Sequence, residues 1–567
     1  MLVLCLTFLL NQTNNIILPQ YLTPEESLRI DEIGKGHMVT APPNQWVETP
    51  GEFETLKGLF IGWVYNSYNA IFREIIRETA EVCKVYLFPG TASEETNMRN
   101  YLTSNGIPLD SITFMRYTKN SIWMRDYGPW FMRKQDRAEG IVDFIYNRPR
   151  PQDDSFPIFI GSQWGISVYG SPLRHPGGNF MIDGIGTGFF SSLINEENSG
   201  YTPAQIASLM MQYSGLEQVI PLKRILTEYT GHIDLWTKIL NDTLIMVGEY
   251  AAGHENDTVL DNRTDSLLRC KNREGFPYRV VRIPMPWTTS DAPPTYINST
   301  MVDKKVLVPT WNLAEDTTGL RIYRDALPGY TVVGIDCSAM SGSGGAIHCI
   351  TMQDPLNRWV HIRHYKLPDT SDTLNAYRVR AQMTYSGSLR PESTLIFYAI
   401  NSNPVYQAVP LSAIADTASI YAGYIPARHW GDTVHYYLLA KNDQGIRRTS
   451  PVDVPPHRFT FLVKSGVVAE EANNNDFFFA LVSPNPSRSR FSITLSMPKP
   501  SPVVIEIFNI LGQKVKTFTG MARRAGAYSI NLDLNRDDHG QKLNAGAYFY
   551  RLITEGNVKT GKILRLE

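Results

Sequence analysis

The sequence predicts an α/β domain of catalytic size followed by two all-β domains. Within residues 40–364, strand-like runs alternate with helical runs, as in LKGLFIGWV, NAIFREIIRETAEVC and KVYLF. Residues 365–463 instead hold alternating strands with turn residues about every ten positions and no helical pattern. The total length of 567 residues fits three or four domains of roughly 100 to 200 residues each.

The α/β region contains strand–helix–strand units along its length. In NAIFREIIRETAEVC the apolar residues are three and four positions apart, which predicts an amphipathic helix between two strands. Similar strand runs recur at ISVYG, TKILNDTLIMVGE, RVVRIPMP and KKVLVPTW. No clear sequence repeat accompanies these units, so any internal repeat must be one of structure.

The rest of the chain reads as β structure with one linker. The strands TLIFYAI, HYYLLAK and HRFTFLV predict an immunoglobulin-like β-sandwich over residues 365–463. Residues 464–480, which include KSGVVAEEANNND, have the composition of a linker. The segment SPNPSRSRFSITLSMP then opens a second, small all-β domain over residues 481–567.

The N-terminus has the pattern of a leader. The apolar stretch MLVLCLTFLL is followed by polar NQTNN, which predicts a signal peptide over residues 1–20 whose positively charged start is cut short. An N-terminal strand or helix within the core is the alternative. Ten residues are about half of what a transmembrane helix needs, so a membrane-spanning protein is not expected.

Charge balance and cysteine spacing argue against a nucleic-acid-binding protein and against one stabilised by zinc or disulfides. With 54 Lys and Arg against 55 Asp and Glu, and no long basic run, the chain lacks the charge pattern of a nucleic-acid-binding protein. Its five cysteines form no CxxC pair and no Cys/His ligand spacing, so neither a zinc site nor a disulfide framework is predicted. One of the thiols could instead be a nucleophile.

Three segments carry candidate catalytic groups. Asp126 lies in SIWMRDYGPW; His232 and Asp234 in EYTGHIDLW are two residues apart and would share one face of a strand. Cys349 follows His348 in MSGSGGAIHC, behind a Gly-rich turn that lets backbone approach a ligand closely. Taken singly, these motifs are also compatible with a surface ion pair at a strand edge and with an inert cysteine.

In combination, a thiol, an imidazole and two carboxylates match the needs of attack on a guanidinium group. This group is a planar cation with a weakly electrophilic carbon. An enzyme therefore needs carboxylates bonded to its N–H groups and a thiolate directed at the carbon. A histidine would protonate the departing ammonia and then deprotonate the water that hydrolyses the intermediate.

The motifs also resemble a known family. WMRDYGPW, GGN at residues 177–179, GHIDLW and GGAIHC, in this order, resemble the Porphyromonas-type peptidylarginine deiminases of the agmatine deiminase, or guanidine-modifying, superfamily. The segments VDFIYNRPRPQDD and TYINS add to the resemblance, which covers about residues 40–364. It implies a pentein fold, a pseudo-fivefold ββαβ propeller with the active site on its axis.

The resemblance assigns roles by motif position. It implies that Asp126 and Asp234 hold the guanidinium, His232 is the acid and base, Cys349 is the nucleophile and Asn298 of TYINS is a polar support near the thiol. It further implies that substrate is lined by Trp123, Tyr229 and Asp183, each of which could equally be an ordinary core or loop residue. No cofactor and no catalytic metal are expected; whether a structural calcium or sodium ion binds is left open.

Arg148 and Arg150 bear on the substrate class. In NRPRPQ the prolines stiffen the loop, and the two guanidinium groups could together bind an α-carboxylate. An internal arginine offers no such carboxylate, so the pair favours arginine at the C-terminus of peptides or proteins. The alternative is a solvated basic turn near Asp153 and Asp154.

The last domain resembles the sorting domain that the type nine secretion system of Bacteroidetes reads. The resemblance lies in its SPNP opening, IEIFNILGQKV, LNAGAYFYRL and a final basic strand. It implies that the secretion machinery is a partner and that the protein is secreted or attached to the outer membrane surface. The alternative is a β-sandwich that only improves solubility. It would explain the strands but not their combination with a leader-like N-terminus.

Three functions follow from these motifs. The first is a secreted peptidylarginine deiminase that forms citrulline and ammonia through a covalent thiouronium intermediate on the cysteine. The second is an agmatine deiminase, which makes N-carbamoylputrescine from a substrate without a carboxylate and leaves the arginine pair without a ligand. The third is an inactive surface-binding protein, which would be expected to have lost at least one of the four catalytic groups.

Overall fold

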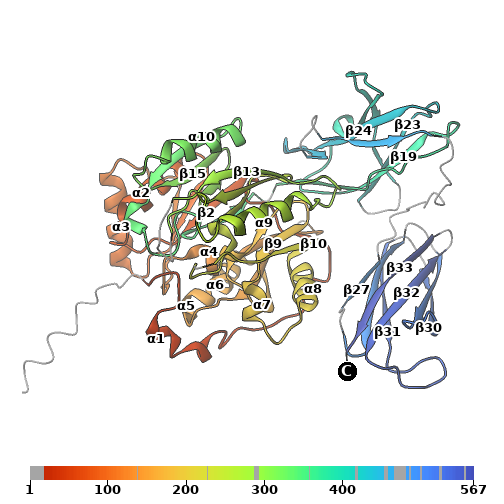
Figure 1. The fold of residues 1–567 in the computed structure, drawn as a ribbon, viewed down its shortest axis with the longest axis horizontal. Helices are drawn as coiled ribbons and strands as arrows, with labels where there is room; N and C mark the ends of the chain where they lie inside the picture. Colours follow the sequence, from red (N-terminus) through yellow and green to blue (C-terminus); the bar gives the residue numbers. More distant parts are fainter. Residues whose placement is uncertain are drawn as a thin grey trace, which may run out of the picture. The chain divides into compact units, whose positions relative to one another are not determined.

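The computed structural model describes residues 18–566, apart from residues 137, 227, 287–292, 357, 415–418, 453–456, 465–479, 484–486, 498–500, 523–525 and 555–556. The chain divides into two compact units between residues 357 and 358 (Figure 1). Of the predicted leader, only residues 18–20 are among those described.

The first unit contains five sheets with one strand pattern. Each sheet contains an antiparallel pair of strands, a crossover with a helix, and a further strand that is parallel to the second strand of the pair; two of the sheets have one additional strand at an edge. This arrangement is five ββαβ units, as the pentein resemblance implies.

The first two sheets come from residues 47–222. One consists of β1 (Val47–Glu48), β5 (Trp130–Lys134), β6 (Glu139–Ile145) and β7 (Ser167–Arg174), with α5 (Pro151–Asp154) and α6 (Phe156–Trp164) in the crossover. The next consists of β8 (Met181–Ile182), β9 (Thr187–Ser191) and β10 (Gln218–Leu222), with α7 (Leu193–Glu197) and α8 (Pro203–Ser214).

The third and fourth sheets follow in chain order. The third has β11 (Thr237–Ile239), β12 (Leu244–Glu249) and β13 (Arg279–Pro284), with α9 (Asp257–Leu268). The fourth has β14 (Thr300–Val302), β15 (Lys305–Thr310) and β16 (Thr331–Asp336), with α10 (Asp316–Ala326).

The fifth sheet joins the two ends of the unit. It contains β17 (Thr351–Pro355), β2 (Leu56–Ile61), β3 (Lys84–Leu87) and β4 (Ile112–Phe114), with α2 (Asn69–Ala80) and α3 (Ala92–Ser104). Thr351 of β17 pairs with Ile61 of β2, so one unit is split between the start and the end of the domain. This split hides the fifth repeat from any inspection of the sequence in chain order.

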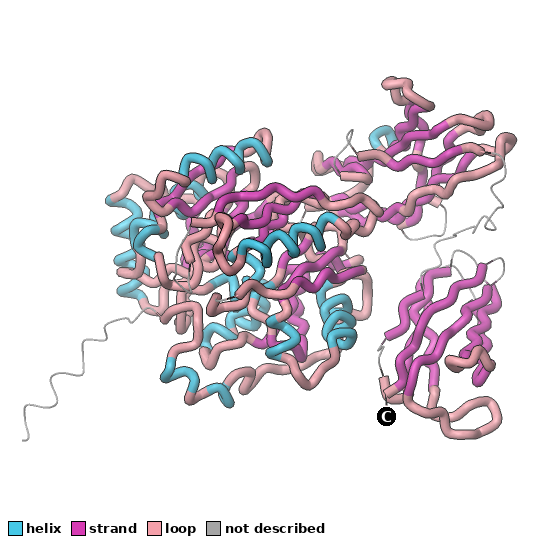
Figure 2. The backbone as a smooth tube through the Cα atoms, viewed as in Figure 1, coloured by secondary structure: helices cyan, strands magenta, loops and turns pink. Residues whose placement is uncertain are grey.

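The predicted amphipathic helix is α2. Its buried residues Ile71, Phe72, Ile75 and Ile76 follow the expected spacing, and the helix packs against β3 and β16. Burial of each such side chain contributes roughly 1.5 to 3 kcal/mol relative to its exposed state. Figure 2 shows the helices of this unit in cyan and its strands in magenta.

Short helical segments fill the loops of the first unit. They are α1 (Pro24–Ser27), η1 (Ile30–Glu32), α4 (Met124–Tyr127), η2 (Gly177–Asn179), η3 (Ile233–Leu235) and η4 (Ser338–Met340). Three of them, α4, η2 and η3, contain motif residues. They determine where the polar side chains of the motifs lie.

The second unit begins with two antiparallel sheets that pack against each other. One contains β18 (Val360–His364), β19 (Tyr377–Tyr385), β22 (Ser412–Ala413) and β23 (Ile420–Ile425). The other contains β20 (Leu395–Ile400), β21 (Gln407–Pro410), β24 (Thr433–Lys441), β25 (Arg447–Ser450) and β26 (Phe459–Leu462), and η5 (Pro391–Ser393) precedes β20.

The boundary between the units differs from the predicted one. Val360 to His364 were expected at the end of the α/β domain, but β18 pairs along its whole length with β19. A strand pattern does not state which sheet the strand joins, so the sequence placed the boundary a few residues too late.

The last domain also has two antiparallel sheets. One has β27 (Ala480–Ser483), β28 (Arg490–Met497) and β31 (Gly526–Asp533); the other has β29 (Ser501–Phe508), β30 (Lys514–Ala522), β32 (Gly546–Thr554) and β33 (Asn557–Arg565). Phe491, Ile505 and Leu552 lie in one core that both sheets share. Among the described residues, no helix is long and apolar enough to cross a membrane.

Candidate active site

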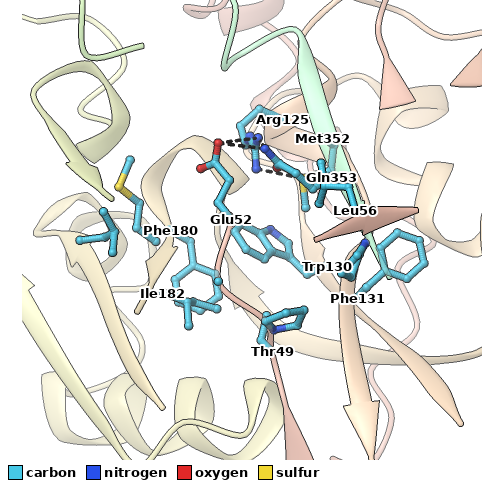
Figure 3. A pocket seen from close by; sticks show the side chains of 15 residues that line it. Thr49, Glu52, Leu56, Arg125, Trp130, Phe131, Phe180, Ile182, Met352 and Gln353 are labelled. Carbon is cyan, nitrogen blue, oxygen red and sulfur yellow. Dashed lines mark hydrogen bonds and ion pairs between the residues drawn. The ribbon is translucent and has the colours of Figure 1, made fainter. Parts of the chain in front are cut away.

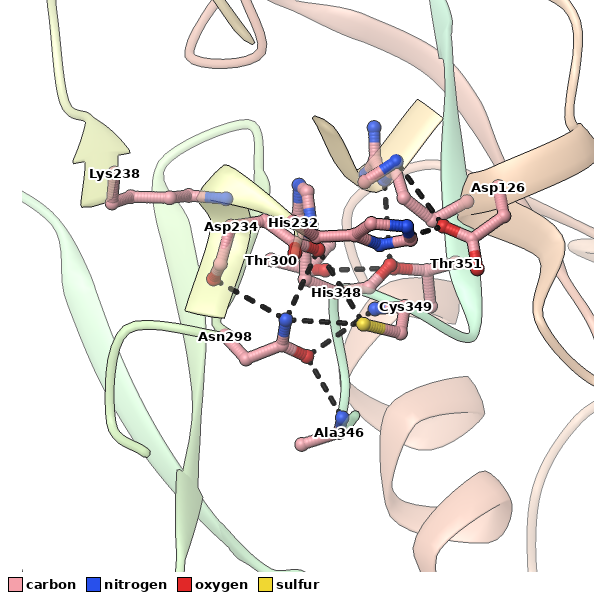
Figure 4. Close-up of polar contacts among 12 residues, drawn as sticks. Asp126, His232, Asp234, Lys238, Asn298, Thr300, Ala346, His348, Cys349 and Thr351 are labelled. Carbon is pink, nitrogen blue, oxygen red and sulfur yellow. Dashed lines mark hydrogen bonds and ion pairs between the residues drawn. The ribbon is translucent and has the colours of Figure 1, made fainter. Parts of the chain in front are cut away.

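The predicted site residues come from one recurrent position in the fold. In each of the five ββαβ units, the segment immediately before the first strand of the unit carries a motif. These segments contain Asp126 before β5, residues 177–179 before β8, His232 and Asp234 before β11, Asn298 before β14 and Cys349 before β17. The fivefold arrangement therefore brings together residues that are far apart in the sequence (Figure 4).

The thiol of Cys349 is buried between two polar side chains. Its Sγ lies 3.1 Å from Asn298 Nδ2 and 3.4 Å from Asp234 Oδ2. Asn298 Oδ1 in turn accepts hydrogen bonds from the backbone N–H groups of Ala346, at 2.8 Å, and Cys349, at 3.3 Å. Asn298 thus holds the loop that carries the thiol, and burial together with the nearby carboxylates raises the pKa of Cys349 well above its ordinary value.

His232 and Asp126 form the opposite side of the site. His232 Nδ1 lies 3.5 Å from Asp126 Oδ1, which also accepts a hydrogen bond from the backbone N–H of Gly178 at 3.1 Å. A Cβ atom at residue 178 would lie 2.6 Å from His232 Nδ1 and 2.8 Å from Asp126 Oδ1. The GGN motif therefore requires glycine at this position because both side chains occupy the space.

The His232–x–Asp234 segment is not a strand. It forms the 3₁₀ turn η3, which His232 precedes, and β11 begins only at Thr237. The Glu228 carboxylate accepts hydrogen bonds from the backbone N–H groups of Thr230, at 2.8 Å, and Gly231, at 2.6 Å, and so shapes the approach to the turn. The expectation of a shared strand face is wrong, but both side chains still lie against Gly178 in the site.

The two carboxylates differ in charge state. Burial, with the nearby charge of Asp234, raises the pKa of Asp126 to about 7. Burial also acts to raise the pKa of Asp234, but hydrogen bonding and attraction to His348 outweigh it, and the net pKa is lowered. Burial lowers the pKa of His232 to about 3 despite the charge of Asp234. The free site at neutral pH thus contains a neutral imidazole, a neutral thiol and an excess of negative charge that favours a cationic ligand.

A buried charged layer supports Asp234 from behind. His348 Nδ1 lies 2.7 Å from Asp234 Oδ2, and His348 Nε2 lies 3.0 Å from Glu52 Oε2. Lys238 donates a hydrogen bond of 2.6 Å to Glu52, and Gln353 donates one of 2.9 Å. Although burial opposes it, attraction to Lys238, His348 and Arg125 holds the pKa of Glu52 well below its usual range. Sequence reasoning missed Glu52 and Lys238, which belong to no chemical motif.

The far side of this layer lines a separate pocket (Figure 3). Glu52 and Arg125 lie at one end of it, and Trp130, Phe180 and Ile182 line the apolar remainder. Cys349 and His232 are not among its lining residues. The space beside the thiol is instead filled by a side chain of the protein itself.

That side chain is Gln20, which no sequence signal singled out. Gln20 Nε2 donates a hydrogen bond of 3.0 Å to Asp126 Oδ2 and lies 3.3 Å from both His232 Nδ1 and Cys349 Sγ. Three buried polar atoms around it, His232 Nε2, Asp234 Oδ1 and Gln20 Oε1, have no hydrogen-bond partner among the described residues. The site therefore retains unused bonding capacity that a larger polar group could satisfy.

The predicted substrate-lining residues occupy different places. Trp123 is fully buried and its Nε1 donates a hydrogen bond of 2.8 Å to the carbonyl oxygen of Leu18. Tyr229 is 57% exposed, and its ring centroid lies 5.0 Å from that of Tyr21. Asp183 accepts hydrogen bonds from the backbone of Ile185 and Thr187 and from the hydroxyl group of Tyr278. Through these bonds Asp183 holds the turn between β8 and β9.

The two predicted carboxylate-binding arginines are buried beside the site. Arg148 Nε donates a hydrogen bond of 2.9 Å to the carbonyl oxygen of Gln20. Arg150 donates bonds of 2.6 and 3.0 Å to the two carboxylate oxygens of Glu26 and one of 2.7 Å to the carbonyl oxygen of Pro19. Arg150 thus already binds a carboxylate, supplied by the chain itself. Within the described parts of the chain, no three His, Cys, Asp or Glu side chains are placed to hold a metal ion.

Comparison with known proteins agrees with this geometry. Residues 48–355 match the Porphyromonas-type peptidyl-arginine deiminase family, and residues 481–565 match the secretion system C-terminal sorting domain. A protein of Streptomyces avermitilis provisionally named agmatine deiminase is 27% identical over 258 residues, which are 41% of this chain and 75% of that protein. One of Latilactobacillus sakei with the same provisional name is 24% identical over 371 residues, 56% of this chain and 99% of its own length.

Solved structures share the fold of the first unit. The agmatine deiminase of Enterococcus faecalis has a TM-score of 0.51 at 19% identity and covers 57% of this chain and 99% of its own. A structure described as an agmatine deiminase on provisional grounds has a TM-score of 0.52 at 20% identity with the same coverage. The sorting domain marks the protein for secretion and attachment to the surface of a Bacteroidetes-type bacterium. With its five ββαβ units and a family match over more than half of its length, the chain belongs to the Porphyromonas-type peptidyl-arginine deiminase family, whose members hydrolyse amidine C–N bonds.

Proposed function

We propose that this protein is a peptidylarginine deiminase that converts peptide arginine, preferentially at a C-terminus, to citrulline and releases ammonia. The observation that carries the proposal is the convergence of Asp126, Asp234, His232 and Cys349 around one buried point, where a neutral amide donor already sits. A guanidinium at this point would donate to both carboxylates and present its carbon to the thiol.

Binding of the cation prepares the thiol for attack. Burial raises the pKa of Cys349, and the charges of Asp234 and Asp126 raise it further. A positive charge bound between the two carboxylates cancels their effect, so the substrate itself favours the thiolate. The same charge favours the ionised form of Asp126, which is only partly ionised in the free protein at neutral pH.

The proposed reaction has two stages. The thiol proton passes to neutral His232, sulfur adds to the guanidinium carbon, and His232 returns the proton to a terminal nitrogen as the C–N bond breaks and ammonia leaves. Water then adds to the thiouronium carbon while His232 accepts its proton. The C–S bond breaks as the C=O bond forms, and the thiol recovers that proton from His232. The second proton of the water passes to solvent, where it converts the released ammonia to ammonium, and the neutral ureido product leaves. One water is consumed for each ammonia released.

The preference for a C-terminal arginine rests on Arg148 and Arg150. Arg148 Nε contacts the carbonyl oxygen of the residue whose side chain enters the site, and this is the place where a substrate would carry its own carbonyl or carboxylate. Arg150 binds the carboxylate of Glu26 nearby, which supports its capacity to bind a substrate carboxylate after exchange. Peptides with C-terminal arginine are therefore the proposed partners.

Agmatine deimination is the second candidate. It is supported by the relatives named as agmatine deiminases and by a catalytic set that would suit any guanidine. Agmatine carries no carboxylate, so it would leave Arg148 and Arg150 without a role in binding. Secretion also separates the protein from polyamine metabolism within the cell.

One comparison of substrates tests the choice. Purified protein is incubated with benzoyl-arginine, with a peptide that contains internal arginine, and with agmatine, and both ureido product and ammonia are measured. We expect the highest kcat/KM with benzoyl-arginine. Higher kcat/KM with agmatine would establish the second candidate, and no product from any of the three would reject both.

Two further assignments remain proposals. The two packed antiparallel sheets of residues 358–463 support an immunoglobulin-like sandwich, because strands such as β24 alternate buried and half-buried residues. We also propose that the deiminase needs no cofactor, because a thiol, an imidazole and two carboxylates supply every proton and charge that the reaction requires.

A further inference from the structure

We propose that residues 18–26 are a substrate-like ligand built into the chain, with Gln20 in the place of the substrate arginine. This inference rests on the proposed function, because it identifies the space around Gln20 as the arginine site. It adds that the folded chain holds this site closed, which requires that the predicted leader is cleaved before Leu18 and not after Gln20. Substrate must displace the segment before it reaches Cys349.

The segment is bound as a peptide is bound. Three consecutive carbonyl oxygens accept hydrogen bonds from side chains of the deiminase unit: that of Leu18 from Trp123, that of Pro19 from Arg150 and that of Gln20 from Arg148. The backbone N–H of Gln20 donates to the carbonyl oxygen of Ser343 at 3.2 Å. These contacts involve main-chain groups, so they do not depend on the side chains of the segment. Another peptide bound along the same path could make the same contacts.

The side chain of Gln20 completes the likeness to a substrate. It is fully buried, and its amide N–H group reaches Asp126 between His232 and Cys349. A Cβ atom at residue 345 would lie 2.6 Å from Cys349 Sγ and 2.8 Å from Gln20 Oε1, so the Gly-rich loop fits around both. An amide is planar and donates hydrogen bonds as a guanidinium does, but it is neutral.

Residues 23–26 anchor the segment. Thr23 and Glu26 form a capping box on α1, which fixes Glu26 toward Arg150. Burial acts to raise the pKa of Glu26, but its bonds to Arg150 and Thr23 and the charge of Arg148 outweigh burial and lower it. A bidentate pair of this kind is among the stronger polar contacts in proteins. Glu26 thus occupies the arginine that the proposed function assigns to the substrate carboxylate.

Because the Gln20 side chain is neutral, a substrate cation can displace it from the two carboxylates. With Gln20 in place the pKa of Asp126 is still raised to about 7, so the amide does not supply the charge that the two carboxylates favour. A substrate cation does supply it. The segment competes because it is part of the same chain and has a high effective concentration.

The test measures access to the thiol in the full chain. Gln20→Ala removes the amide and Glu26→Gln weakens the anchor, while Glu25→Gln changes the exposed neighbour as a matched control. Iodoacetamide labelling is followed by peptide mass spectrometry, and the rate at Cys349 is divided by the rate at Cys337, which is buried outside the site. Division by this reference separates release of the segment from general unfolding.

We expect this ratio to rise roughly tenfold or more in Gln20→Ala and Glu26→Gln, and to stay at the wild-type value in Glu25→Gln. The kcat/KM for benzoyl-arginine should rise with it. If the labelling ratio is the same in the wild-type protein and in all three variants, the inference is overturned, even if all four proteins deiminate arginine. A raised ratio without product from any substrate would instead support closure and reject the proposed function. If the leader is cleaved after Gln20 before the protein folds, the segment cannot occupy the site. N-terminal sequencing that shows this cleavage would also overturn the inference.

Discussion

His348 Nδ1 lies 2.7 Å from Asp234 Oδ2, the carboxylate oxygen that Asn298 Nδ2 also contacts at 3.1 Å. The other ring nitrogen of His348 lies 3.0 Å from Glu52. The residue before the proposed nucleophile thus links Asp234 to a buried charged layer. This link gives His348 a positioning role, because it orients Asp234 without a place beside the substrate.

We predict that His348→Ala lowers kcat/KM for benzoyl-arginine by about 10- to 100-fold. Because the contact with His348 lowers the pKa of Asp234, its loss raises that pKa and should add a second ionisation to the acid limb that Asp126 determines. His348→Gln can still donate a hydrogen bond and should recover part of the activity. A loss of activity without this second ionisation in the pH profile would contradict this role.

Asp126 should determine the acid limb of the wild-type protein. Its pKa with Gln20 in place is raised to about 7, so kcat/KM should rise as the pH increases through that value and the carboxylate ionises. Asp126→Asn should cost at least about 100-fold, equivalent to roughly 2 to 4 kcal/mol, and should remove this limb. Asp234→Asn should cost as much. Wild-type kinetics in either variant would place the guanidinium elsewhere.

Cys349→Ala should abolish turnover without loss of the fold. The thiol supplies the covalent intermediate, and removal of one sulfur atom leaves Asn298 and its bonds to the loop backbone in place. Citrulline assays and thermal unfolding, measured on the same preparation, separate the two effects. Any measurable citrulline from this variant would reject the nucleophile assignment.

Replacement of Arg148 and Arg150 by Ala should raise the KM for a C-terminal-arginine peptide far more than the KM for its amide. The expected loss is about 30- to 1000-fold in kcat/KM for the carboxylate, because a bidentate contact disappears, whereas the amide has no charge to lose. Arg148→Ala alone should show a large part of the difference, since Arg150 is also engaged with Glu26. Equal losses on both substrates would mean that the arginines only hold the loop.

Deletion of residues 545–567 should block secretion. It removes β32 and β33, which leaves β29 with β30 as its sole remaining partner in that sheet. Fractionation should find the truncated protein within the cell envelope, still able to form citrulline because the deiminase unit is separate. Normal secretion would refute the sorting role, and insoluble protein without a change of location would support a stabilising tail.

Much of the chemistry could be read from local sequence. Residue types and their order identified Asp126, His232, Asp234 and Cys349, and the geometry now places them around one point. The spacing of apolar residues also predicted α2, because helix periodicity is a local property. The turn at His232 was misread, since a two-residue spacing is compatible with both a strand and a 3₁₀ turn.

The sequence by itself determined which side chains are candidates for the catalytic site and that the first domain alternates strands and helices. Only the tertiary structure decided that β17 pairs with β2 and splits one unit, that Glu52 and Lys238 support Asp234, and that Gln20 fills the site. These are contacts between residues separated by hundreds of positions or lacking any motif of their own. No local pattern encodes such contacts, because they depend on how the five sheets assemble.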